Sequence, residues 1–74
     1  MTQATTAERY ALRQRRDRLT QRSAFLSAET QRLTDSHDAH ALRMLIGQLR
    51  EHSADLNAYH HALDLFHGRV GPLS

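Results

Sequence analysis

The stretch that decides the fold is residues 42–70, which read LRMLIGQLREHSADLNAYHHALDLFHGRV. Two series of residues recur in it every seven positions, and the second series begins three residues after the first. The series are Leu42, Leu49, Leu56, Leu63 and Val70, and then Leu45, His52, Tyr59 and Phe66. Alternating intervals of three and four residues place both series along one side of an α-helix. The pattern predicts an amphipathic helix over about residues 39–67, with Gly68 as its left-handed terminator, Gly71-Pro72 preventing its continuation, and a tail over 68–74.

A second helix is predicted upstream, over about residues 6–33. Its leucines also recur every seven positions, at Leu12, Leu19, Leu26 and Leu33. The sequence Thr5-x-x-Glu8 matches a capping box, in which each side chain bonds the backbone of the other residue, so residues 1–5 are expected to form a tail. The partner heptad positions are polar, namely Arg16, Ser23 and Thr30. The apolar stripe of this helix is therefore narrow.

The segment between the two helices is Thr34-Asp35-Ser36-His37-Asp38. It is polar and contains three residues that are good helix N-caps, which favours a turn over residues 34–38. The alternative is one uninterrupted helix, because neither Gly nor Pro stands in the segment.

A turn at this place predicts an all-α fold, a single two-helix antiparallel hairpin resembling a coiled coil. A chain of 74 residues is too short for a second domain, and it contains no Cys that could form a disulfide scaffold. In the hairpin register Leu26 lies opposite Leu45, and His52 lies on the seam. We expect the imidazole of His52 to find a hydrogen-bond partner across the hairpin, and its polar ring to fix the register.

The second helix carries more apolar surface than the narrow leucine stripe can cover, which is typical of an interaction surface. We therefore expect the hairpin to be completed by self-association or by a protein partner. The residues predicted to bind that partner are Leu45, Leu49, Leu56, Tyr59, Leu63 and Phe66.

Basic charge is concentrated in the first helix. Residues 8–22 contain six arginines and two acidic residues, a net charge of +4, whereas the remaining residues carry −2. The candidate anion-binding residues are Arg9, Arg13, Arg15, Arg16, Arg18 and Arg22. We interpret them as a solvated face that attracts an acidic protein, with nucleic-acid binding or a regulatory role as the alternative.

The sequence contains no recognisable catalytic motif, and a two-helix hairpin offers no concavity that excludes water, so we expect no enzymatic activity, no cofactor and no small-molecule substrate. His60, Asp64 and His67 share one helix face, but an incomplete ligand set favours solvated side chains over a metal site. The residues at the start lack the features of a secretory signal, and no apolar run is long enough to span a membrane. A soluble, cytoplasmic protein is expected.

The capped, Arg-rich first helix, the polar turn after Leu33 and the second helix ending in Tyr59, Leu63 and Phe66 carry a resemblance to a known family. Over residues 7–67 the length and pattern resemble the small hairpin co-chaperones that hold type III secretion needle subunits in the cytoplasm. The resemblance implies a helical hairpin that pairs with a larger helical-repeat chaperone and keeps the needle subunit from polymerising.

Overall fold

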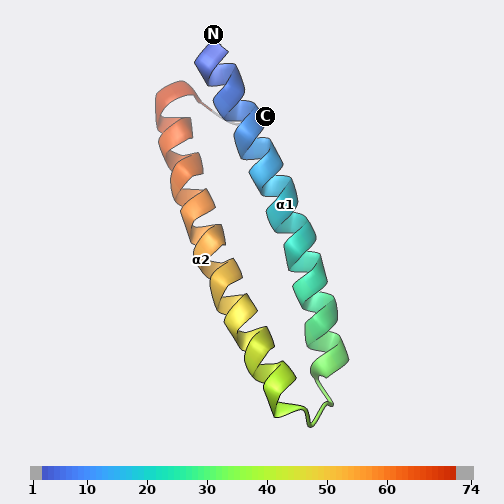
Figure 1. The fold of residues 1–74 in the computed structure, drawn as a ribbon. Coiled ribbons are helices and arrows are strands. Elements are labelled where there is room, and N and C mark those ends of the chain that lie inside the picture. The colour runs from blue at the N-terminus through green and yellow to red at the C-terminus, as the bar shows by residue number, and fades with distance from the viewer. Residues whose placement is uncertain (1–2, 72–74) are drawn as a thin grey trace.

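The computed structural model describes residues 3–71, which form two long helices, α1 (Gln3–Leu33) and α2 (Ala39–Val70). The helices lie antiparallel in a rod of 54 × 16 × 15 Å, and the start of α1 is beside the end of α2 (Figure 1). The all-α, two-helix hairpin expected from the heptad pattern is confirmed.

The turn falls at the predicted residues, and its polar side chains close both helices. The Ser36 amide donates to the carbonyl of Leu33 at 3.0 Å, which ends α1. Asp38 is the N-cap of α2, and its carboxylate accepts a hydrogen bond from the Ala41 amide at 3.0 Å. The alternative of one continuous helix is therefore wrong.

Both outer helix ends differ from the prediction. α1 already includes Gln3, so Thr5 and Glu8 lie inside the helix and do not form its cap. The Glu8 carboxylate instead accepts hydrogen bonds from both terminal nitrogens of Arg69. The partner that competes with the local cap comes from the other helix, 61 residues away in the sequence.

α2 continues three residues beyond its predicted end. Gly68 is helical, and the left-handed residue is Gly71, with φ of 96° and its amide bonded to the His67 carbonyl at 3.0 Å. Pro72 follows Gly71 in the sequence and disfavours a helical conformation of the residue before it. Of the two predicted stop signals, the Gly71-Pro72 pair ends the helix and Gly68 does not. The remaining positions of the expected tails, residues 1–2 and 72–74, lie outside the described residues.

The core is the single layer of side chains between the helices. α1 contributes Leu19, Leu26 and Leu33, and α2 contributes Leu45, His52, Tyr59 and Phe66. Leu26, Leu33 and Leu45 form one cluster near the turn, as the predicted register requires. A core of this kind buries the faces that meet and leaves the other sides of both helices in solvent.

The residues of α1 that lie beside its buried leucines at the seam are not the partner heptad positions predicted from the sequence. Arg16, Ser23 and Thr30 are exposed, whereas Arg15, Arg22 and Glu29 are half-buried. Residues three and four positions from a leucine both lie beside it on a helix, so the spacing alone does not choose between them. The choice follows from the rotation of α1 about its axis, which allows Arg22 to bond Asp55.

Candidate binding surfaces

The six residues predicted to bind a partner fall into two groups. Leu45, Tyr59 and Phe66 are buried in the hairpin, and Phe66 is only 1% exposed. These three side chains therefore hold the two helices together and do not form an external surface. Leu49 is exposed, and Leu56 and Leu63 are half-buried, so this second group remains accessible.

The accessible leucines belong to one continuous strip, which we call the leucine edge. It consists of the heptad series Leu42, Leu49, Leu56, Leu63 and Val70. Leu49 and Val70 are 39% and 38% exposed, and the neighbouring Ile46 is 49% exposed. The leucine edge thus presents a row of aliphatic side chains along most of α2.

Ion pairs show which sides of the helices adjoin. Arg22 bonds Asp55 at 2.7 Å and pairs with Glu51 at 3.5 Å, and Arg69 bonds Glu8. The α2 members of these pairs lie on one side of the buried series of α2, and the leucine edge lies on the other side. On the other side of the hairpin, the leucine edge is therefore flanked by the exposed polar residues of α1, Arg16, Ser23 and Thr30. No apolar side chain of α1 stands in that heptad series to cover it.

The six candidate anion-binding arginines do not form one patch. Arg9 lies over the Phe66 ring, 5.2 Å from its centroid, and Arg16 pairs with Asp17 at 3.4 Å. Arg22 is held by Asp55 and Glu51, and Arg13 is half-buried and engaged in an interaction of its own. Within the described part of the chain, Arg15 and Arg18 are the two members of this set that form no ion pair, hydrogen bond or ring contact.

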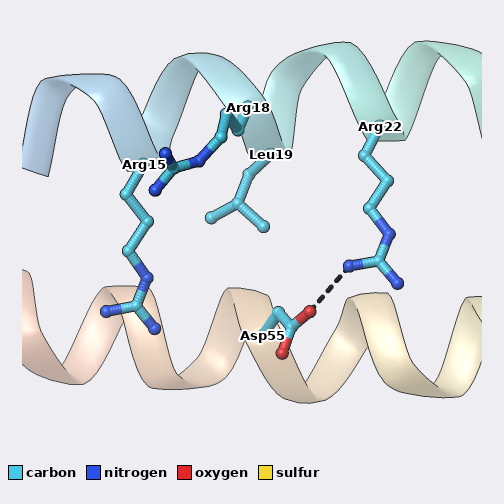
Figure 2. Close-up of a pocket in the computed structure, with 5 residues that line it drawn as sticks. All are labelled: Arg15, Arg18, Leu19, Arg22 and Asp55. Atoms are coloured by element: carbon cyan, nitrogen blue, oxygen red, sulfur yellow. Dashed lines mark hydrogen bonds and ion pairs between the residues drawn. The ribbon is translucent and has the colours of Figure 1, made fainter.

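Arg15 and Arg18 line a hollow of about 430 Å³ between the helices, together with Leu19, Arg22 and Asp55. Figure 2 shows the Arg15 side chain crossing toward α2 while the Arg18 side chain runs along α1 toward Arg15. Leu19 points toward α2 between the two helices, and Arg22 reaches Asp55. Three guanidinium groups against one carboxylate leave the hollow with a net charge of +2.

A second hollow of about 320 Å³ adjoins the first toward the open end of the hairpin and shares Arg15 with it. Its walls are mainly apolar, formed by Ala11, Leu12, Ala62, Leu65 and Phe66, and the Glu8–Arg69 pair lies at its rim. The Arg69 guanidinium lowers the pKa of Glu8 below its ordinary value of 4.5, chiefly through the hydrogen bond, so the pair is charged at neutral pH.

Sequence reasoning did not include Asp55, Ala62, Leu65 or Arg69 among the site residues. Three of them could have been found from the sequence, because Asp55, Ala62 and Arg69 recur at the same seven-residue interval as the buried series of α2. They lie on the side of that series away from the leucine edge.

His52 differs from the prediction in an informative way. It is buried on the seam as expected, with 6% exposure, but neither ring nitrogen has a hydrogen-bond partner in the described structure. The expected bond across the hairpin is therefore absent from the described structure. A buried imidazole without partners costs stability.

The histidines of the C-terminal half do not converge. Among residues 3–71 the structure brings no three His, Cys, Asp or Glu side chains together in a group that could hold a metal ion. His60 and His67 instead lie beside the rings of Tyr59 and Phe66, respectively. Neither described helix combines the length and apolarity required to cross a membrane.

Comparison of this chain with known protein families, with curated proteins and with solved structures finds no match.

Proposed function

We propose that the protein is a non-enzymatic protein-binding module, and that a protein partner or a second copy of the chain covers the leucine edge. The observation that carries this proposal is the row of aliphatic side chains on α2 that α1 covers only in part. Leu49 and Val70 of this row and the neighbouring Ile46 are each more than one third exposed. Continuous exposed apolar surface on a small chain is typical of an interface. Burying a fully exposed side chain of this type contributes about 1.5–3 kcal/mol, so several partly exposed ones supply useful affinity.

Within this class we propose the narrower role of a small chaperone or adaptor of a secretion system, acting in the cytoplasm as part of an oligomer or heterodimer. This role rests on the resemblance in length and pattern over residues 7–67. In such a role the leucine edge shields an apolar surface of the partner until that partner is handed on.

The alternative is a basic nucleic-acid-binding or regulatory protein that uses the Arg-rich α1. Phosphate binding requires free cations, but Arg9, Arg16 and Arg22 already contact groups of this chain. This leaves a smaller basic surface than six arginines in the sequence suggest, and it makes a protein partner the better fit.

The test is the substitution of Leu49 by Gln, with Met44→Gln as a matched control. Met44 is 56% exposed and lies outside the leucine edge, so both variants replace one accessible apolar side chain on α2. We expect sedimentation velocity at micromolar concentration to show association of the wild type, alone or with protein recovered by affinity purification from the source cells. Leu49→Gln should weaken that association about tenfold or more, and Met44→Gln should not.

A compact, cooperatively melting wild-type monomer that recovers no protein would refute the proposal. Recovery of nucleic acid without protein would favour the alternative.

A further inference from the structure

The two hollows described above form one groove on the face of the hairpin away from the leucine edge. They meet at Arg15. Their α1 residues lie along one side of the helix, at Glu8, Ala11, Leu12, Arg15, Arg18, Leu19 and Arg22. From residue 8 to residue 22 a helix rises about 21 Å. The groove thus extends over about four helical turns.

The chemistry of the groove changes along its length. Toward the open end its walls are apolar, with Leu65 57% exposed and Ala11 and Ala62 too small to fill the space between the helices. Toward the middle of the hairpin, Arg15 and Arg18 add two cations that no carboxylate of the described chain neutralises. An occupant must bury aliphatic side chains against the first part and present negative charge to the second.

We propose that this groove binds an amphipathic helix of a protein partner, with acidic residues on the side that faces Arg15 and Arg18. An α-helix of about 14 residues matches the length of the groove, and laying the apolar face of a helix into a groove between two others is an established mode of recognition. Small residues at the groove wall let the backbone of such a helix approach closely. The occupant completes a three-helix arrangement in this half of the molecule.

The partner is not a second copy of this chain. Most carboxylates of the described residues are engaged within the hairpin, in the pairs Glu8–Arg69, Asp17–Arg16, Glu29–Arg32 and Asp55 or Glu51 with Arg22, while Asp38 caps α2. Only Asp35 and Asp64 are left, and they stand in the turn and on α2 far apart in the sequence. No helix of this chain therefore offers the acidic stripe that the groove requires.

The inference is independent of the leucine edge, because the two surfaces lie on opposite sides of the seam. The probe is a fluorescein-labelled synthetic peptide. Its helix of about 14 residues spans the four turns of the groove, and end caps bring its length to about 16–18 residues. Leu and Ala lie on one face of this helix, and Glu lies beside them. Its controls are a peptide of the same composition with scrambled order and a labelled DNA duplex. Binding to the full chain is measured by fluorescence anisotropy.

We expect the amphipathic peptide to bind and the scrambled peptide to bind at least tenfold more weakly. Arg15→Glu/Arg18→Glu should weaken peptide binding by at least tenfold. Arg43→Glu/Arg50→Glu is the matched control, because it makes the same change in net charge at exposed residues of α2 that do not line the groove, and it should change affinity less than threefold. Leu65→Ala should also weaken binding, and Leu49→Gln should leave it unchanged.

Several results would overturn the inference. No peptide binding at concentrations up to about 100 μM would do so, as would equal weakening by the two double variants, which indicates unspecific charge attraction. Tighter binding of the duplex, lost in Arg15→Glu/Arg18→Glu, would assign the groove to nucleic acid. Dissociation of a wild-type oligomer by that same double variant would assign it to a second copy of the chain. Because Leu49→Gln reports on the leucine edge alone, failure of either proposal is recognised separately.

Discussion

Replacing His52 by Leu is expected to stabilise the hairpin by about 2 kcal/mol. His52 is 6% exposed, and both of its ring nitrogens are buried without a hydrogen-bond partner in the described structure. A neutral imidazole carries one N–H donor and one acceptor nitrogen, and leaving each buried group unsatisfied costs about 1–3 kcal/mol, so the two together cost about 4 kcal/mol. Leu removes both polar atoms and fills a similar volume, while the change of shape costs up to about 1.5 kcal/mol.

The assay is thermal and urea unfolding followed by circular dichroism at two protein concentrations, because association makes the apparent stability concentration-dependent. For a domain of this size 1 kcal/mol shifts Tm by about 4–8 °C, so we expect an increase of roughly 8–16 °C. His61→Leu is the matched control. His61 is exposed on the outer side of α2, and its substitution should change the free energy of unfolding by less than about 0.5 kcal/mol.

The reasoning is wrong if His52→Leu folds to the same helical content but leaves the free energy of unfolding unchanged or lower. Such a result means that the imidazole does bond a group in solution, and that its polar atoms stabilise the seam.

Three other substitutions test the helix ends and the middle of α2. Gly47 is helical and nothing lies within 4 Å of an added Cβ, so Gly47→Ala should stabilise the chain by up to about 1 kcal/mol in urea unfolding. Gly71→Ala should instead destabilise the chain, because φ at Gly71 is 96°. Equal effects of the two substitutions would contradict the assigned end of α2. Arg69 lowers the pKa of Glu8 below 4.5, so the stabilisation by this pair is complete above that value and disappears as the pH falls through the lowered pKa. The Tm values of wild type and Arg69→Gln, measured between pH 6 and about pH 2, should therefore approach each other as the pH falls. A difference in Tm that does not change with pH would refute this link.

The sequence was sufficient for the parts of the fold that depend on local spacing. The seven-residue recurrence identified the buried series of both helices, and the cluster of N-cap residues placed the turn correctly at residues 34–38. Two errors, the cap of α1 and the residues beside its buried leucines, concern places where a contact across the hairpin overrides a local preference. Glu8 would cap a lone helix, but Arg69 offers it a charged partner, and that partner is visible only when the two helices are aligned.

The candidate site was predictable to a similar extent. The Arg-rich segment and the excess of apolar surface on α2 are properties of the sequence, and both surfaces of the hairpin derive from them. Which arginine remains free depends on whether a carboxylate of α2 stands opposite, as Asp55 does for Arg22 but not for Arg18. Which apolar residue is core depends on the rotation of each helix, which buried Tyr59 and left Leu49 accessible.

The covalent connection of the helices at one end only gives the hairpin a gradient of local stability. Contacts near the turn close short loops, as between Leu33 and Leu45, whereas the Glu8–Arg69 pair closes a loop of 61 residues. The entropy cost of closing a loop rises with its length, and the end of a helix pair has neighbours on one side only, so the free ends separate at a lower free energy than the turn. Amide hydrogen exchange should therefore quicken steadily from the turn toward the open end. The apolar part of the groove lies in that fast-exchanging half, so a helix bound there would slow exchange in both α1 and α2 and hold their free ends together.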